Sequence, residues 1–405
     1  MNPAETSPNK RPALRNLLPL LEQGSAALFT FAINFIASLR MDAVPFVKFT
    51  TVWIASLLIV TLSNAVVFQP AMWAIMHQRN HAQHRVLFKA SGLLALMLLL
   101  ATGYYMWVMQ HSDPTTSPYN WLTISLIAMI SLFEFVRRLL MLSSKWLVSF
   151  AINLVMMVTV GLSFIGRPSL NQVWIHLILI YGVAILTALC FAHPMLRPRD
   201  EVERKPGLLK DLLSFGTPLL GAGLSFWFIT GGYLLLLNHA LQPAQSASLR
   251  ALQNLFSGIM VLLAAFDNWA LAQPDRLTLK QARFIEKGLL GVVIAWGLVL
   301  SVVAPRLFHK FSVSPFMVLF FTLSYAALSS ARLWMSIAKQ SGNSMLAMNS
   351  QTFACVSFLL LVGVQWYLKL ALSATSITIL WAIAMMAMWL LVRKKSARHV
   401  LEMSA

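Results

Sequence analysis

The chain has 405 residues, of which 58% are hydrophobic and only 11% are charged. So few charges cannot cover a water-soluble domain of this size, which excludes a soluble globular enzyme or binding module. The net charge of +18 would suggest a nucleic-acid partner in a soluble protein. In a membrane chain the same excess arises because Lys and Arg collect in cytoplasmic loops, so we expect no nucleic-acid partner.

Apolar runs of about 20 residues, long enough to cross ~30 Å of hydrocarbon, recur along the whole chain. The residues before the first run are polar and basic, and no small-residue cleavage site follows a short apolar core, so the first span is expected to be a retained anchor. In chain order the runs predict twelve spans, at Leu18–Leu39, Phe46–Met72, Val86–Gln110, Trp121–Leu140, Trp146–Ile165, Val173–Pro194, Leu212–Leu237, Ser246–Ala272, Ile285–Val303, Pro315–Ile337, Ser344–Leu368 and Ser373–Val392.

The distribution of positive charge predicts the orientation of these spans. With both termini in the cytoplasm, 24 of the 31 Lys and Arg residues lie in inner segments and inner span ends. A count shifted by one span would destroy this alternation, so we expect a multi-pass protein with twelve spans and both termini in the cytoplasm. The seven cations on the predicted outer side are Arg40, Lys48, Arg167, Arg250, Arg306, Lys310 and Lys369.

A short phrase repeats and divides the chain into two halves. Ser63–Pro70 returns 204 residues later as Asp267–Pro274, with Asn, Gln and Pro at matching places, and each copy closes the second span of its half. Because each half contains six spans, an even number, both halves enter the membrane in the same direction. We expect an all-α protein with two pseudo-symmetric six-helix lobes around a central cavity, the usual architecture of a transporter.

The longest hydrophilic connection lies between spans six and seven. The stretch Arg197–Pro206 is charged and flanked by prolines, as expected of a linker. It predicts an N-terminal lobe at 1–194, a cytoplasmic linker at 195–211 and a C-terminal lobe at 212–405 that ends in a basic cytoplasmic tail.

Cations near the outer ends of the paired spans are candidates for substrate binding. Lys48 lies early in span two and Arg250 early in span eight, and the repeat places Lys48 only two positions from Arg250. Arg40 ends the first span nearby. Guanidinium groups bind phosphate oxygens bidentately, so such a cluster suits an anionic headgroup. The alternative is that these long side chains reach the interface and contact only lipid headgroups.

Three acidic residues inside the predicted spans are candidates for binding a coupling H⁺ or Na⁺. They are Glu22, Glu134 and Asp267. Buried carboxylates are costly in a membrane and commonly mark ion pathways. Arg138 stands one helical turn after Glu134 and could neutralise it. Asp267 has no local partner in the sequence, and a polar contact between helices is its alternative role.

Other polar positions suggest structural roles. Asn64 and Asn268 are expected to bond across helices near the inner face, and Pro70 and Pro274 to kink or end spans two and eight, with a gate as their shared role. The pair Gly231-Gly232 would let span seven bend, although close helix packing is its commoner use.

Neither a metal site nor a cofactor is expected. The histidines at 77, 81 and 84 have helical spacing but lie in a basic loop without a carboxylate or thiol, and Cys190 and Cys355 sit inside apolar spans. The sequence has no phosphate-binding glycine loop and no nucleophile elbow. Transport would therefore be driven by an ion gradient.

Several phrases along almost the whole chain resemble the polysaccharide transporters of the MOP exporter superfamily, the Wzx-type O-antigen flippases. The sequence departs from them at the turn Asp42–Pro45 and before span eight, where glycines are usual in the family. The phrases that carry the resemblance are Leu21–Gly24, Ala32–Phe35, Leu39–Arg40, Phe215–Pro218, Leu249–Asn254 and Ala331–Leu333 followed by Gly342.

The resemblance implies the movement of an oligosaccharide on undecaprenyl pyrophosphate from the cytoplasmic to the outer leaflet, for O-antigen or exopolysaccharide synthesis. It adds Arg332 to the candidate headgroup residues, and a polysaccharide polymerase and a chain-length regulator to the candidate partners beside membrane lipids. The chain would then not be an enzyme. The alternatives are a multidrug exporter of the same superfamily, a polymerase, ligase or acyltransferase of glycan assembly, and a scaffold that does not transport.

Overall fold

The protein is represented by a computed structural model, and the structure describes residues 12–68, 83–111, 120–143, 145–166, 168–196, 219–272, 279–340 and 344–404. Side chains at some helix ends lie outside the description as well.

Helices account for nearly all of the described chain. Those that precede the linker are α1 (Pro12–Arg40), α2 (Ala43–Ser63) continued by the π-helix η1 (Asn64–Phe68), α4 (Gln83–His111), α5 (Trp121–Leu142), α6 (Trp146–Ser163) and α7 (Leu170–Leu196). The later ones are a helical segment Leu219–Leu237 that includes the π-helix η2 (Phe228–Gly232) and α9 (Tyr233–Leu237), then α10 (Pro243–Ala272), α11 (Leu279–Leu307), α12 (Pro315–Gln340), α13 (Ser344–Tyr367) and α14 (Ala374–Ser404).

These helical segments match the twelve predicted spans in number and order, which confirms the all-α, polytopic fold class. Within the described residues, nine of them are long and apolar enough to cross a membrane by themselves. The other three are α1, α5 and α10. Each of these three carries charged groups inside the bundle, such as Glu22, Glu134 and Arg250, and charged groups in a membrane generally mark functional positions.

Local sequence explains where several helices begin. Both α10 and α12 start at a proline, whose fixed φ and missing N–H suit the first helical position. Asn120 and Thr123 form a reciprocal capping box at the start of α5, with bonds of 3.0 and 2.8 Å. Helix α14 continues beyond its apolar part to Ser404, so the helix ends later than the membrane span that was predicted to end at Val392.

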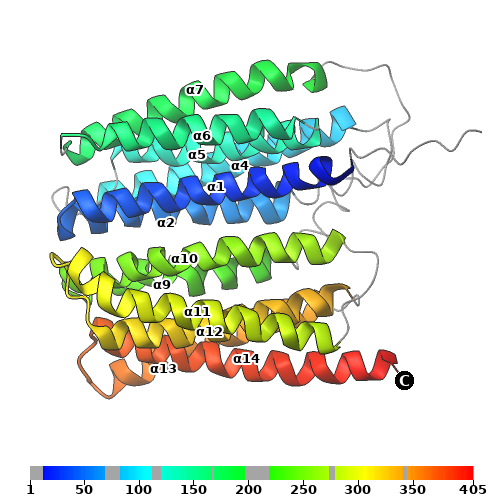
Figure 1. The fold of residues 1–405 in the computed structure, drawn as a ribbon. Coiled ribbons are helices and arrows are strands. Elements are labelled where there is room, and N and C mark those ends of the chain that lie inside the picture. Colours follow the sequence, from blue (N-terminus) through cyan, green and yellow to red (C-terminus); the bar gives the residue numbers. More distant parts are fainter. Residues whose placement is uncertain are drawn as a thin grey trace, which may run out of the picture.

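Two lobes lie side by side with their helices nearly parallel (Figure 1). One contains α1 to α7 and the other contains the 219–237 segment to α14. The lobes meet where α1 and α2 pack against α10 and α9. Helix α7 runs to Leu196, and the rest of the predicted linker at 195–211 lies outside the described residues.

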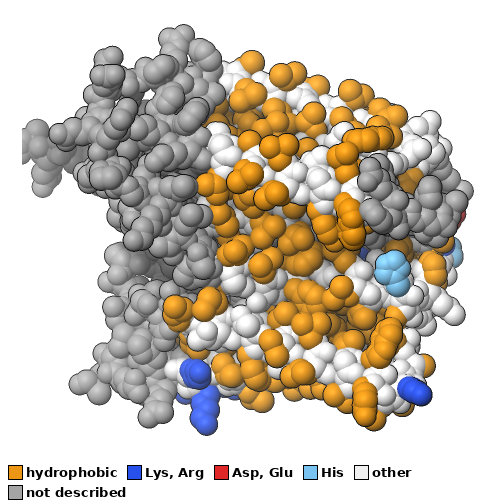
Figure 2. All heavy atoms as spheres, turned by 180° about the vertical axis from the view of Figure 1, so that it is seen from behind, with side chains coloured by type: hydrophobic (Ala, Val, Ile, Leu, Met, Phe, Trp, Pro, Cys, Tyr) orange, Lys and Arg blue, Asp and Glu red, His pale blue; other side chains and the backbone are white. Residues whose placement is uncertain are grey.

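The outward faces of the bundle are apolar in their middle. Figure 2 shows a broad field of hydrophobic side chains, with the Lys and Arg side chains near its edges. Leu99 on α4, Leu186 on α7 and Leu298 on α11 are about two-thirds exposed. Only a lipid environment makes such exposure favourable over so large an area, because monomeric soluble proteins keep exposed apolar patches small.

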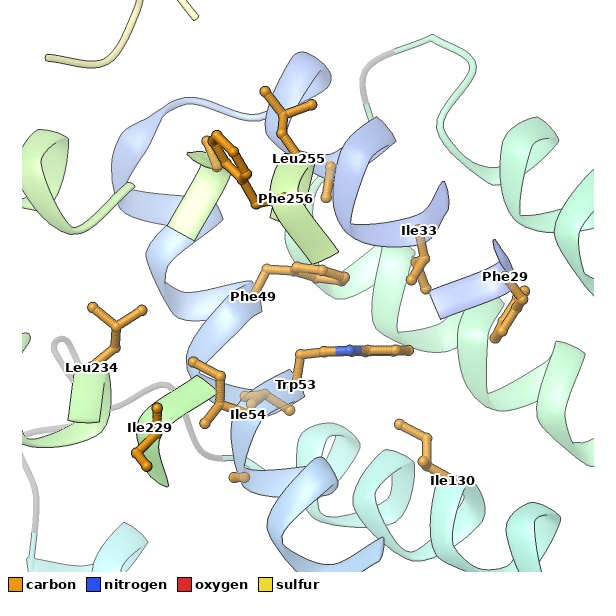
Figure 3. Close-up of a cluster of buried hydrophobic side chains, with 14 of the residues drawn as sticks. Phe29, Ile33, Phe49, Trp53, Ile54, Ile130, Ile229, Leu234, Leu255 and Phe256 are labelled. Atoms are coloured by element: carbon orange, nitrogen blue, oxygen red, sulfur yellow. The ribbon is translucent and has the colours of Figure 1, made fainter. Parts of the chain in front are cut away.

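The hydrophobic core continues from one lobe into the other. Figure 3 shows Ile54 of α2 next to Ile229 of the second lobe, whereas Phe49 and Trp53 of α2 point into the first lobe. These four side chains are at most 2% exposed. Helix α2 is therefore the main element of the first lobe at the interface, and it positions the polar contacts described next.

Candidate functional site

One end of the lobe interface is closed by a short set of contacts. The turn between α1 and α2 places Asp42 against Lys310, with 3.1 Å between Oδ1 and Nζ. One turn farther along α2, the ring of Phe46 stacks on Phe311 at 5.5 Å between centroids. The ion pair is exposed and contributes little by itself, about 0–1 kcal/mol. This end is the one that the charge distribution predicts to be outer.

Deeper in the interface, hydrogen bonds join α2 to the seventh helical segment. The indole Nε1 of Trp227 donates to the carbonyl of Ile54 at 3.0 Å. The amide Nδ2 of Asn238 donates to Thr51 Oγ1 at 3.1 Å. Buried polar groups that bond across helices fix the register of the two lobes.

Arg250 lies at this interface, in the first third of α10, and is only 7% exposed. Its Nη1 donates to Gln253 Oε1 at 3.0 Å, while its Nε is buried and has no hydrogen-bond partner among the described residues. A Cβ built on Gly231 would stand 3.4 Å from Nη1 and 3.7 Å from Ile54, so the guanidinium reaches the contact between the lobes. No carboxylate in the described part of the chain pairs with it.

A buried guanidinium with a single neutral partner is expensive for the fold. The desolvation of an ion costs several kcal/mol, and a carboxylate normally offsets it. Two further hydrogen bonds keep Gln253, the acceptor for Arg250, in place. Its Nε2 donates to the carbonyl of Thr230, and the hydroxyl of Tyr325 donates to the backbone carbonyl of Gln253 at 3.2 Å. Among the described residues, the charge of Arg250 is therefore left without a compensating anion.

The other predicted cations differ from Arg250 in their burial and in their contacts. Lys48 is half-buried on α2, one turn before Thr51. Arg40 is exposed at the end of α1. Arg332 on α12 is half-buried and places its guanidinium 5.0 Å above the ring of Phe226, within the second lobe. A single buried cluster of four cations is therefore not formed.

In the first lobe, Arg137 holds both predicted carboxylates. Its Nη1 bonds Glu22 at 2.5 Å and its Nη2 bonds Glu134 at 2.8 Å. Glu22 is fully buried and also accepts from Ser149 at 2.8 Å. The expectation that Arg138 neutralises Glu134 is wrong, because Arg137 makes the ion pair from the face of α5 that meets α1.

A small cavity with mainly apolar walls adjoins this network. Its volume is ≈ 40 Å³, and its polar lining residues include Thr30, Glu134, Asn153 and Tyr181. Trp53 also lines it, and both Trp53 Nε1 and Asn153 Oδ1 are buried without a hydrogen-bond partner in the described structure. A site with an unused donor and an unused acceptor suits a water molecule.

The predicted gate residues are described only in part. Asn64 lies in η1, where its Oδ1 is buried and accepts no hydrogen bond from the described residues, so this oxygen does not make the expected bond between helices. Asp267 and Asn268 lie on α10, but their side chains fall outside the description. Pro70, Pro274 and the histidines at 77 and 81 lie outside the described residues, and His84 lies in the first turn of α4 with its side chain outside the description.

The sequence analysis did not identify Glu286, a carboxylate on α11 that is 4% exposed. Its Oε1 accepts from Ser330 Oγ, from Trp334 Nε1 at 3.1 Å and from Trp389 Nε1 at 3.4 Å. Glu286 stands beside the exposed Lys287 in a polar first part of α11, and this sequence is typical of a solvated helix surface. The signal for its burial is helical spacing, because Ala282, Glu286 and Val293 are four and seven residues apart and share one buried face.

The paired glycines lie in the π-helix η2, beside Trp227 and Arg250. Single π-turns are frequent at functional sites. A Cβ on Gly232 would fall 2.5 Å from the Trp227 ring, whereas a Cβ on Gly231 would meet nothing closer than 3.4 Å. Gly232 therefore leaves room for the ring of Trp227 on its own helical segment, and this contact tests neither of the two roles considered for the pair.

Gly232→Ala should destabilise the protein by about 1–3 kcal/mol, because the methyl group must displace Trp227 and weaken its bond to Ile54. Gly231→Ala is the matched control, with an expected change below about 1 kcal/mol. Thermal unfolding in detergent measures both. Equal melting temperatures for the two variants would contradict this packing.

The sequence matches no protein-family model and no curated protein. Solved structures do match. An inward-facing multidrug resistance MATE family transporter of the MOP superfamily has a TM-score of 0.70 and 11% identity, over 93% of this chain and 95% of that one. The lipid II flippase MurJ, in an inward closed conformation, has a TM-score of 0.59 and 10% identity, over 94% of this chain and 86% of that one. The Vibrio cholerae MATE transporter VcmN, in its bent form, has a TM-score of 0.53 and 15% identity, over 95% of this chain and 98% of that one. The TM-scores establish a shared fold, the two-lobe helical fold of such transporters.

Proposed function

We propose that this chain is a flippase that moves an anionic, lipid-linked substrate between the leaflets of a membrane. The observation that carries the proposal is Arg250, a buried guanidinium at the lobe interface that no described carboxylate neutralises. A phosphate or pyrophosphate would complete its charge and bond its unused Nε. Undecaprenyl pyrophosphate bearing an O-antigen or exopolysaccharide unit is the substrate that we infer, in the bacterial inner membrane.

Such a substrate needs a protein path because its headgroup is very polar. Each unsatisfied polar group costs several kcal/mol in hydrocarbon, so unassisted crossing is prohibitive. The lobes would rock against each other, with the contacts at Asp42–Lys310 and Phe46–Phe311 opening toward the outer side. The isoprenoid tail would stay in the bilayer throughout, and no covalent chemistry by the protein would be required.

For the coupling ion, the first lobe supplies the described candidates. Glu22 and Glu134 share Arg137, and the cavity beside Glu134 has room for a small cation or water. Asp267 remains a candidate on sequence grounds. Lys48, Arg40 and Arg332 would contact the headgroup at other stages, when the lobes have moved. A polymerase and a chain-length regulator would receive the flipped lipid.

The second candidate function is multidrug export, because several matching structures belong to MATE transporters. Many drugs of exporters are organic cations. A buried, unpaired guanidinium at the interface repels them, since like charges brought together cost several kcal/mol. The charge of Arg250 therefore favours an anionic substrate.

Purified protein in proteoliposomes separates the two functions. We expect transfer of an undecaprenyl-pyrophosphate-linked glycan between leaflets, competed by undecaprenyl pyrophosphate and not by cationic dyes. Empty liposomes and liposomes with an unrelated transporter are the controls. Transport of a cationic dye that undecaprenyl pyrophosphate does not inhibit would assign the chain to drug export instead.

A further inference from the structure

Glu286 is an ionisable group in the core of the second lobe that has no cationic partner among the described residues. It stands about 10 Å from the start of α11, at 1.5 Å per residue. The helix starts at the end of the bundle that is predicted to face the cytoplasm. From this geometry we propose that Glu286 binds and releases a proton during transport, as a site separate from the Glu22–Arg137–Glu134 network. The inference rests on the proposed function for its role in the cycle.

The three donors around Glu286 all approach the same oxygen. Ser330, Trp334 and Trp389 bond to Oε1, and in the described structure no group bonds to Oε2. An indole N–H can only donate, so Oε1 must be an acceptor. It can accept either as part of a carboxylate or as the carbonyl of a protonated acid. A proton can therefore join or leave Oε2 without rearranging these hydrogen bonds.

The two lobes treat their buried acids differently. In the first lobe, Arg137 supplies a full positive charge to both Glu22 and Glu134. The donors on Glu286 are neutral, so the charged form gains hydrogen bonds but no ion pair. Such a group can exist in both protonation states, which a proton carrier requires.

Exposed cations stand at the rim of the Glu286 site. From α14, the exposed Arg393 stacks on Trp389 with its Cζ 5.3 Å from the ring centroid. On α11 itself, Arg283 and Lys287 are exposed and lie next to the buried face. From α12, Arg332 contacts Phe226 instead. In the proposal, Oε2 exchanges its proton with the cytoplasmic side past this rim.

Protonation would also change the packing of three helices. Glu286 on α11 joins α12 through Ser330 and Trp334, and α14 through Trp389. A charge-assisted hydrogen bond is roughly twice as strong as a neutral one, so these helices are held more tightly when Glu286 is ionised. The proton would thus loosen one lobe and favour its movement relative to the other.

Difference infrared spectroscopy of the purified protein tests the site without any transport assay. A pH step should produce a protonated-carboxyl band in the wild type that is missing in Glu286→Gln, which retains an oxygen acceptor for the three donors. Lys287→Gln, which removes an adjacent exposed charge, should keep the band. A wild-type spectrum identical to that of Glu286→Gln, across the whole pH range in which the protein stays folded, would overturn the proposal.

Carbodiimide labelling gives a second measurement that needs no variant. The reagent attacks protonated carboxyls in apolar surroundings, so mass spectrometry should find an adduct on Glu286 that increases as the pH falls. An adduct that never forms, or that is independent of pH, would contradict the site. In proteoliposomes, Glu286→Gln should lose only the part of transport that depends on a pH gradient. A titrating Glu286 in a protein that moves no lipid-linked glycan would instead contradict the proposed function and leave the proton site intact.

Discussion

Replacing Arg250 with Met should reduce transport of a pyrophosphate-linked glycan by about 30-fold or more. Loss of one partner of a buried, hydrogen-bonded charge pair costs about 2–5 kcal/mol, and each 1.4 kcal/mol is a factor of ten in affinity. The apolar side chain of Met is close to that of Arg in length, so the cavity term is small. Initial rates of leaflet transfer in proteoliposomes measure the effect.

The same variant should melt at the wild-type temperature or above it. Among the described residues Arg250 has only Gln253 as a hydrogen-bond partner, and replacing a poorly compensated buried ion with an apolar group is often neutral or stabilising. Arg250→Lys keeps the charge but cannot bind two phosphate oxygens as a fork, so it should recover only part of the rate. Arg306→Met removes an exposed cation and serves as the matched control. Full transport by Arg250→Met would remove Arg250 from the substrate site.

Arg137→Met should have the opposite signature, a large loss of stability. The substitution leaves Glu22 and Glu134 as buried carboxylates without a cation, which costs about 3–5 kcal/mol. We expect a marked fall in melting temperature in detergent and a low yield of folded protein. The contrast with Arg250→Met separates a cation that maintains the fold from one that serves a ligand.

Removal of the negative charges supplies the control. The triple variant with Glu22→Gln, Glu134→Gln and Arg137→Met should recover much of the lost stability, because no ion is then left unpaired in this network. Coupling between the substitutions is expected since the three side chains touch. If Arg137→Met alone melts like the wild type, the network does not hold the first lobe together.

The order of the helices was predictable because each apolar run must cross the same thickness of hydrocarbon. The start of α6 at Trp146 and that of α12 at Pro315 coincide with the predicted spans. The ends were harder, because a helix continues beyond the apolar layer wherever the following residues form helix, as α14 does to Ser404. Hydropathy indicates which residues lie in the apolar layer, whereas the ends of a helix are set by its backbone hydrogen bonds.

Partners far apart in the sequence could not be predicted from local spacing. Arg137 and Arg138 both stand about one turn from Glu134, and only the position of α1, which carries Glu22, decides which of them turns inward. Arg250 was predictable as a candidate because a cation so near an apolar span requires an explanation. Glu286 was missed because its charged neighbours resemble a solvated helix start and outweigh the helical spacing of Ala282, Glu286 and Val293, and its polar contacts come from α12 and α14, far away in the sequence.

Leaflet-resolved quantification of undecaprenyl-linked glycan, in cells depleted of this protein, tests the central claim most directly. The account predicts that completed units accumulate on the cytoplasmic leaflet, and that the wild-type chain relieves the accumulation while Arg250→Met, present at equal abundance, does not. Unchanged pools on both leaflets would contradict a flippase, and glycan retained on the outer leaflet would place the protein in polymerisation or ligation.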